Sequence, residues 1–323
     1  MAIASLQLQT GMIQYLYLGR VDYAEALRLQ QELVALRTAG RIGNVLLLLE
    51  HPPVLTLGRN ANRSNILASD ELLAARGVTL HEINRGGDVT YHGPGQLIGY
   101  PIFDLRSLHN PSGHNRLGPV DFVRLMEEAL IRVCGELGVP AGRICRLTGV
   151  WCGPPEPQLS FKSAPSIVSG PCDAPTHSAG RKIAAIGIHV ARGVTSHGFA
   201  LNVTTDLRDF SLINPCGITD RPVTSLEREV PDATNLPSLE SLAYMSAREF
   251  GLVFNEPVEF VDGLAELRAL ADAAQESPAS NSSSGEFPAP EFPAPVFPAQ
   301  DTPLQIPPEI DRLRRGKDRP VSA

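Results

Sequence analysis

The sequence contains no long hydrophobic run, although 43% of its 323 residues are hydrophobic. A helix that crosses a membrane needs about 20 mostly apolar residues, and no segment approaches that length. The first residues also lack the basic region followed by an apolar region that marks a secretory signal peptide. We therefore expect a cytoplasmic protein without a membrane partner, long enough to form one large domain or two smaller ones.

Metal-binding cysteine motifs and basic stripes are also missing. The five cysteines are irregularly spaced and form no Cys-x-x-Cys pair, which is the spacing typical of zinc sites and redox centres. We therefore expect free thiols and no metal. The net charge of -7 arises in the C-terminal part, where residues 231–323 contain 7 basic and 15 acidic residues. No basic stripe indicates a nucleic-acid partner.

Hydrophobic periodicity predicts several helices and strands. Asp22 and Glu25 have the spacing of a capping box at the start of the first helix, and Gly40 follows its end. The apolar run at 45–49 is too short for a good helix and predicts a buried central strand. We expect longer helices at 22–39, 120–137 and 239–254, and strands at 44–50, 54–57, 78–84, 97–103, 182–190 and 198–203.

Residues 85–96 form the most unusual segment of the chain. Four glycines and a proline are mixed there with Arg85, Tyr91 and His92, directly after a predicted strand. Glycine lets backbone amides approach a ligand closely and accepts positive φ. A surface turn needs only one or two glycines. The segment therefore predicts a loop that binds a small ligand.

Two segments lack the composition of a folded core. Residues 154–180 are rich in Pro, Ser, Ala and Gly without periodicity, which is typical of a loop insertion. Residues 275–323 contain a direct repeat of Glu-Phe-Pro-Ala-Pro and predict a disordered, acidic, Pro-rich tail. We expect one catalytic domain at 1–274, interrupted by the 154–180 insertion, and a tail at 275–323.

Three blocks of the chain resemble the lipoyl(octanoyl) transferases. These are residues 85–96, residues 180–187 and residues 196–202, the last followed by Asn214-Pro215-Cys216-Gly217. The blocks occur in the order expected for that family. The resemblance implies a single α/β catalytic domain with a mixed β-sheet flanked by helices, similar to the catalytic domains of biotin protein ligases and lipoate ligases.

The resemblance also implies an activity. It is an acyltransferase reaction without a cofactor, in which an octanoyl group moves from octanoyl-acyl carrier protein, through a cysteine thioester, to a lysine of a lipoyl domain. The implied acceptors are the lipoyl domains of 2-oxoacid dehydrogenases and the glycine cleavage H protein. This transfer is the first step of endogenous protein lipoylation.

Cys216 and Lys182 are the predicted catalytic residues. A cysteine suits acyl transfer because its thiolate is accessible near neutral pH and is intrinsically reactive. Lys182 is one of only three lysines, and a lysine beside the thiol favours the thiolate and can transfer protons. His92 and His197 are either pocket-lining groups or satisfied core histidines. The predicted substrate-binding residues are Arg85, Gly86, Gly87, Asp88, Val89, Thr90, Tyr91, His92, Ala185, Ile186, Gly187, Gly198, Phe199 and Ala200.

Other functions remain open at this stage. An ATP-dependent lipoate or biotin-type ligase activates a free acid as an adenylate and needs no cysteine. Such ligases commonly use a basic glycine-rich phosphate loop, and here Asp88 stands where a second base would help. A cysteine-dependent amidotransferase between two lipoyl proteins would use the same nucleophile. A non-enzymatic scaffold would only hold a lipid and bind partners through the Pro-rich tail.

Overall fold

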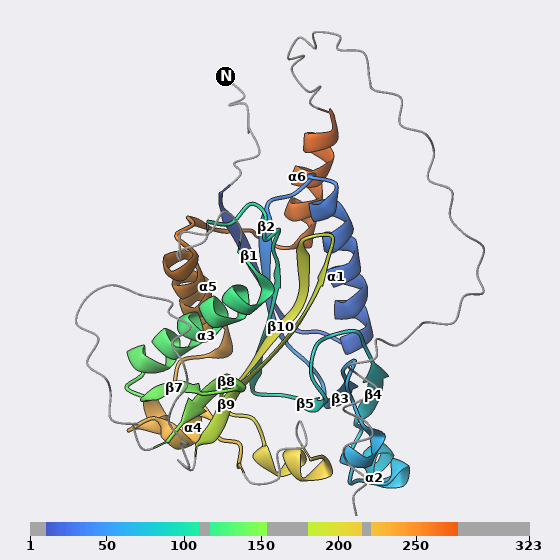
Figure 1. Ribbon diagram of the computed structural model, residues 1–323, viewed down its shortest axis with the longest axis vertical. Coiled ribbons are helices and arrows are strands. Elements are labelled where there is room, and N and C mark those ends of the chain that lie inside the picture. Colours follow the sequence, from blue (N-terminus) through green and yellow to red (C-terminus); the bar gives the residue numbers. More distant parts are fainter. Residues whose placement is uncertain (1–10, 110–116, 154–179, 215–220, 277–323) are drawn as a thin grey trace, which may run out of the picture. The chain divides into compact units, whose positions relative to one another are not determined.

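An eight-stranded mixed sheet lies at the centre of the computed structural model (Figure 1). The structure describes residues 11–109, 117–153, 180–214 and 221–276. β1 pairs in parallel with β2 and β11, and all other neighbouring strands of this sheet are antiparallel. In spatial order the strands are β11 (Val258–Phe260), β1 (Ile13–Arg20), β2 (Asn44–Glu50), β6 (Gln96–Ile102), β10 (Val194–Asn202), β9 (Arg181–Ala191), β8 (Leu147–Cys152) and β7 (Ala141–Ile144).

Helices cover both faces of this sheet. α3 (Pro119–Glu136) and α5 (Leu239–Phe254) pack on one face, and α1 (Tyr23–Thr38) and α6 (Leu264–Glu276) pack on the other (Figure 1). β2 contributes side chains to the apolar cluster on each face, because successive side chains of a strand point to opposite faces. A central strand covered on both sides needs an uninterrupted apolar run, which explains the sequence of β2.

Local signals in the sequence determine where the helices begin and end. The Asp22 carboxylate accepts hydrogen bonds from the backbone N–H groups of Ala24 and Glu25 at the start of α1, as the capping pattern predicts. Pro119 occupies the first turn of α3, where its missing N–H has no cost. α5 ends at Asn255, whose φ of 55° closes the helix in the left-handed conformation.

A separate three-stranded sheet positions the glycine-rich segment 85–96. Its order is β4 (Thr79–Glu82), β3 (Val54–Leu57) and β5 (Val89–His92). Its apolar side packs with Leu73 of α2 (Asp70–Ala75) and with Leu212. The segment 85–96 leaves β4, forms β5, and continues directly into β6 of the large sheet. The small sheet therefore holds this segment beside the centre of the large one.

The predicted mixed α/β fold is confirmed, and most predicted elements agree with the structure to within a few residues. The predicted insertion at 154–180 and the tail at 275–323 lie outside the described residues except at their edges. The expectation of free thiols is correct for the buried Cys134 and Cys152. It is wrong for Cys145, which is disulfide-bonded and lies in the turn between β7 and β8.

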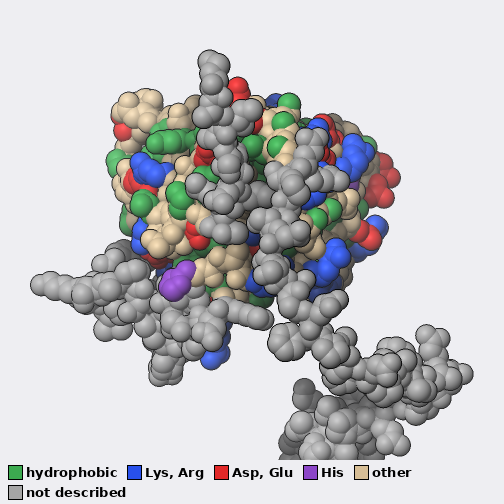
Figure 2. Space-filling view, turned by 90° about the horizontal axis from the view of Figure 1, so that it is seen from above, with side chains coloured by type: hydrophobic (Ala, Val, Ile, Leu, Met, Phe, Trp, Pro, Cys, Tyr) green, Lys and Arg blue, Asp and Glu red, His purple; other side chains and the backbone are tan. Residues whose placement is uncertain are grey.

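The described surface is mixed in charge. Figure 2 shows acidic and basic side chains interspersed over one face of the molecule. Two ion pairs join α6 to the region of α1, between Arg268 and Glu32 and between Arg41 and Asp272. None of the described helices is long and apolar enough to cross a membrane.

Candidate active site

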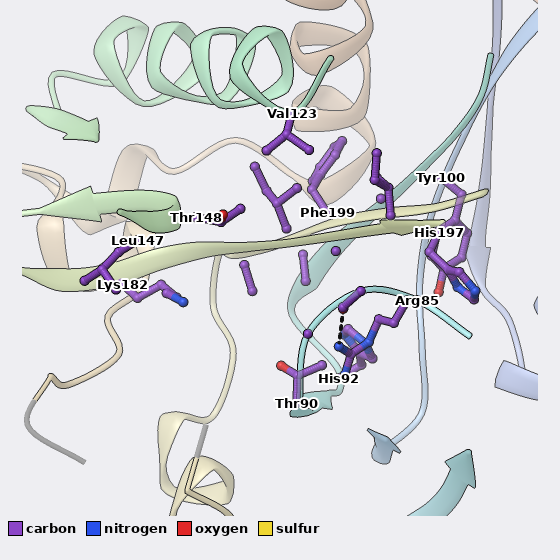
Figure 3. Close-up of a pocket in the computed structure, with 18 of the residues that line it drawn as sticks. Arg85, Thr90, His92, Tyr100, Val123, Leu147, Thr148, Lys182, His197 and Phe199 are labelled. Atoms are coloured by element: carbon purple, nitrogen blue, oxygen red, sulfur yellow. Dashed lines mark hydrogen bonds between the residues drawn. The ribbon is translucent and has the colours of Figure 1, made fainter. Parts of the chain in front are cut away.

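A cavity of about 360 Å³ lies between the glycine-rich segment 85–96 and the β9–β10 hairpin (Figure 3). This volume is at the small end of the range for small-molecule sites. Most of the wall is apolar or backbone. Its residues are Tyr23, Arg85, Gly86, Gly87, Thr90, His92, Tyr100, Val123, Arg146, Leu147, Thr148, Lys182, Ala185, Ile186, Gly187, Ile188, His197, Gly198, Phe199 and Ala200.

Small residues of β9 and β10 make room for the cavity. The predicted pocket residues Ala185, Gly187, Gly198 and Ala200 all lie in its wall. A Cβ atom at Gly187 would lie 2.7 Å from the Gly86 carbonyl oxygen, which is closer than real Cβ contacts allow. The close approach permits the Gly86 N–H to donate a 2.9 Å hydrogen bond to the Ile188 carbonyl. Glycine at 187 thus fixes the distance between the two walls.

Arg85 anchors the glycine-rich segment. Its guanidinium is buried, and it donates to the Thr56 carbonyl at 2.8 Å and to the Thr56 hydroxyl at 3.0 Å. A third bond reaches the Gly86 carbonyl at 3.0 Å. These contacts connect the centre of the small sheet to the turn that faces β9. Because five N–H donors sit in one rigid plane, arginine suits this bridging role.

Three residues of the predicted site lie away from the cavity. Val89 and Tyr91 point into the apolar cluster of the small sheet, and the Tyr91 hydroxyl donates to Asp209 at 2.7 Å. Residues 89–92 form β5, so side chains alternate, and Thr90 and His92 face the cavity instead. Asp88 accepts a hydrogen bond from the Asn62 backbone N–H and holds the loop. These three residues of the predicted 85–92 pocket segment are therefore not part of the wall of this cavity.

Three buried histidines lie at the inner end of the cavity or behind it. The pKa of His92 is lowered to about 3, and those of His51 and His197 to about 4, chiefly because burial disfavours the charged imidazole. The nearby Arg85 guanidinium lowers the pKa of His92 and His197 further. All three rings are therefore neutral at neutral pH.

Hydrogen-bond partners assign the tautomers of these rings. Gln96 uses its amide donors on Tyr91 and Asn202, so its oxygen accepts from His92 Nδ1 at 2.8 Å. His51 donates from Nδ1 to the Val21 carbonyl and accepts the Tyr100 hydroxyl at Nε2, each at 2.7 Å. His92 and His197 line the cavity, and each is also buried and hydrogen-bonded. The two alternatives considered from the sequence, a pocket-lining group and a satisfied core histidine, therefore both describe these residues.

Lys182 lies at the opposite end of the cavity from Tyr100 and His197 (Figure 3). Its Nζ lies 4.6 Å from the centre of the Trp151 ring, where the π face attracts a cation. Gly149 lies beside the Lys182 side chain, and a Cβ there would be in ordinary contact with Cε at 3.5 Å. The Gly149 N–H donates to Glu127, a fully buried carboxylate that also binds Arg124 and Arg143. Lys182 is therefore held in a defined position.

Cys216, the predicted nucleophile, lies outside the described residues. Its two described flanks contact the site. The Asn214 N–H donates to the Asn65 carbonyl at 2.7 Å, and Asn65 in turn hydrogen-bonds to Asp88 of the glycine-rich segment. On the other side, Val223 forms a parallel bridge with Lys182. The chain on each side of 215–220 is thus fixed next to the cavity wall.

Sequence reasoning missed several residues of the cavity wall. Tyr23 and Tyr100 are buried and belong to a helix and a strand that were predicted only as core elements. Arg146, Leu147 and Thr148 come from the β7–β8 hairpin, which has no clear turn signal in the sequence. Nothing in the sequence indicates that Val123 and Ile188 line a cavity, because an apolar residue in a cavity wall has the same sequence pattern as one in the core.

The wall is suited to an apolar ligand, and Lys182 lies at one end of it. Its histidines are neutral and hydrogen-bonded, and β9 and β10 line it with alanine, glycine, isoleucine and phenylalanine as well as Lys182 and His197. Among residues 11–109, 117–153, 180–214 and 221–276, no cluster of His, Cys, Asp and Glu side chains could hold a metal ion.

Comparisons with known proteins agree on one family. Residues 22–244 match the lipoyl protein ligase A/B catalytic domain. A protein of Acidobacterium capsulatum named octanoyltransferase is 55% identical over 79% of this chain and 96% of its own length. The octanoyltransferase of Koribacter versatilis is 52% identical over 79% of this chain and 90% of its own.

A solved structure shares the fold. The lipoate protein ligase of Thermoplasma acidophilum, described as bipartite, superposes with a TM-score of 0.52 at 16% identity, over 82% of this chain and 92% of the ligase. At that identity the likeness extends to the fold.

Proposed function

Since the chain belongs to the lipoyl protein ligase A/B catalytic domain family, we propose that it is an octanoyltransferase of protein lipoylation. The substrate is an octanoyl thioester of acyl carrier protein, and the acceptor is a lysine of a lipoyl domain. One observation carries the proposal: a small apolar cavity ends at Lys182 in a chain 55% identical to an octanoyltransferase. The cavity would hold the acyl chain, with its carbonyl carbon near Lys182.

The proposed reaction has two acyl transfers. The Cys216 thiolate attacks the thioester carbonyl, the bond from this carbon to the carrier sulfur breaks, and the carrier thiolate takes a proton from Lys182. The acceptor amine then attacks the acyl-enzyme thioester, gives a proton to Lys182, and forms the amide as the Cys216 thiolate leaves. Cys216 is the nucleophile of the first transfer and the leaving group of the second, and Lys182 carries the proton in both. The flanks of 215–220, fixed beside Asn65 and Lys182, support this assignment.

The acceptors included in the proposal are the lipoyl domains of 2-oxoacid dehydrogenases and the glycine cleavage H protein. The pocket residues proposed to contact the octanoyl chain are those predicted from the sequence that lie in the cavity wall. The cytoplasmic location, the domain at 1–274 and the tail at 275–323 also remain proposals. α6 reaches Glu276, which places the end of the described fold two residues beyond the proposed boundary.

A transfer assay separates this function from the competing ones. Apo lipoyl domain is incubated with octanoyl-acyl carrier protein and no ATP, with free octanoate and ATP, or with an octanoylated lipoyl domain and no ATP. We expect modification only in the first case. Modification only in the second would identify a ligase, and modification only from an octanoylated lipoyl domain would identify an amidotransferase.

Substitution of Lys182 tests its proposed role in the same assay. Lys182→Arg keeps a positive charge but does not release a proton readily, so we expect it to abolish transfer. Lys317→Arg makes the same chemical change in the tail and should leave the rate unchanged. Equal rates for both variants would show that Lys182 is not the proton carrier.

A further inference from the structure

Polar aromatic side chains gather at the end of the cavity opposite Lys182, where Figure 3 shows Tyr100. The His51 ring lies behind the wall there, with its centroid 5.0 Å from that of Tyr23, 6.0 Å from Tyr100 and 6.1 Å from His92. Tyr23 and His92 belong to the wall and are only 2% and 8% exposed. An acyl chain whose carbonyl lies near Lys182 therefore points its methyl end toward these rings.

The Tyr23 hydroxyl has no hydrogen-bond partner in the part of the chain that the structure describes. A buried tyrosine usually finds one, and phenylalanine would fill the same apolar space. The hydroxyl is not sealed inside the protein either, since the sealed side-chain atoms without a partner among the described residues belong to Gln30, Trp151 and Ser246. The Tyr23 hydroxyl therefore faces the cavity, and its partner must come from within it.

Nε2 of His92 is a second polar atom of this kind. Nδ1 of the ring donates to Gln96 at 2.8 Å, and the ring is neutral, so Nε2 has no proton and can only accept. No donor from the described ranges reaches it, and it is not sealed in protein. Together the two side chains offer one acceptor and one hydroxyl that can donate or accept, which suits water or a ligand hydroxyl and not a methyl group.

These two atoms make the cost of a long acyl chain a matter of hydration. A chain that ends short of them leaves both atoms in contact with water. A longer alkyl chain displaces this water and cannot replace its hydrogen bonds, so it loses affinity although it buries more apolar surface. In a cavity with an apolar end, by contrast, each added methylene would bind more tightly until it met the wall.

We propose that the Tyr23 hydroxyl and Nε2 of His92 form a polar stop that limits the length of the transferred acyl chain. The inference rests on the proposed octanoyl transfer and assigns its chain-length selection to two residues. It also defines a further class of substrate. A chain long enough to reach the polar stop is accepted when it ends in a hydroxyl, which donates to His92 and accepts from Tyr23. Neither residue takes part in the bond changes.

Two donors of equal length test the polar stop. The 9-hydroxynonanoyl and decanoyl groups have the same number of heavy atoms and differ only in their last one, and each is supplied on acyl carrier protein at saturating lipoyl domain. We expect the wild-type kcat/KM to favour the hydroxylated chain by about tenfold. Tyr23→Phe should lower this ratio by about fivefold or more. The variant should fold as stably as the wild type in urea denaturation, because the hydroxyl has no described protein partner to lose.

Tyr15→Phe is the matched control. Tyr15 of β1 is also buried, at 9% exposure, but it is not part of the cavity wall, so its variant should keep the wild-type ratio. A wild-type ratio at or below one would overturn the inference without any variant. An unchanged ratio in Tyr23→Phe, or an equal change in Tyr15→Phe, would also overturn it. Absence of any wild-type transfer from octanoyl-acyl carrier protein would instead refute the proposed function.

Discussion

Gly187→Ala tests whether the narrow contact between β9 and the glycine-rich segment shapes the acyl site. The new Cβ would lie 2.7 Å from the Gly86 carbonyl oxygen, which is 0.7 Å short of the 3.4 Å at which ordinary contact begins. The segment must therefore move away from β9. This movement strains the 2.9 Å hydrogen bond from the Gly86 N–H to the Ile188 carbonyl.

Two costs follow from this displacement. Overpacking costs about 1–3 kcal/mol, and a weakened backbone hydrogen bond adds up to about 1 kcal/mol. We expect the free energy of unfolding to fall by about 2–3 kcal/mol, measured by urea denaturation. The methyl group also takes space that one methylene of the ligand would fill, worth about 0.8 kcal/mol. Transfer rates measured with carriers of six, eight and ten carbons should therefore shift toward the shorter chain.

Gly142→Ala is the matched control for this variant. Gly142 also lies in a strand, and a Cβ there would meet no atom within 4 Å. We expect its stability and its chain-length profile to equal those of the wild type. If Gly187→Ala also behaved like the wild type, the close contact would not shape the acyl site, and the assignment of the cavity to the octanoyl chain would be wrong.

Three further predictions concern the support of the site. Glu127→Ala should lower the free energy of unfolding by about 3 kcal/mol, because it removes a buried acceptor from two arginines and the Gly149 N–H. Its control is Glu128→Ala, which removes a partly exposed carboxylate and should lower the free energy of unfolding by less than about 1 kcal/mol in the same denaturation assay. The three buried histidines have pKa values of about 3 to 4 in the folded state, so between these values and pH 6.5 they bind protons only in the unfolded state. The free energy of unfolding should therefore decrease as the pH is lowered, by roughly 5 kcal/mol from pH 7 to pH 5. His197→Asn should remove about a third of that slope, and an unchanged slope would contradict the neutral assignment. A chain cut after Glu276 should keep its melting temperature and its transfer rate, and a large loss of rate alone would show that the tail acts in catalysis or in substrate docking.

The sequence predicted the elements whose signals are local. The carboxylate of Asp22 caps α1, the apolar run at 45–49 lies in the buried strand β2, and α5 spans the same residues, 239–254, that periodicity indicated. These signals are local because they depend on backbone hydrogen bonds and on side chains a few residues apart.

Features that depend on contacts between distant segments were not predictable. His51 is a buried neutral imidazole that links Val21 to Tyr100, and no local pattern in the sequence indicates either contact. The direction of Val89 and Tyr91 depends on the strand β5, which the glycine content of its neighbours concealed. Arg146 joins the site only through the β7–β8 hairpin, whose strands are short and weakly patterned.

The covalent intermediate on Cys216 is the central claim, and intact-protein mass spectrometry tests it most directly. The wild-type enzyme is incubated with octanoyl-acyl carrier protein without ATP or acceptor, and peptide mapping locates any adduct. We expect one octanoyl group on Cys216, its release as octanoylated product on addition of a lipoyl domain, and no adduct or transfer in Cys216→Ala. Transfer by Cys216→Ala at the wild-type rate, or an adduct on another residue that passes to the lipoyl domain, would contradict the account.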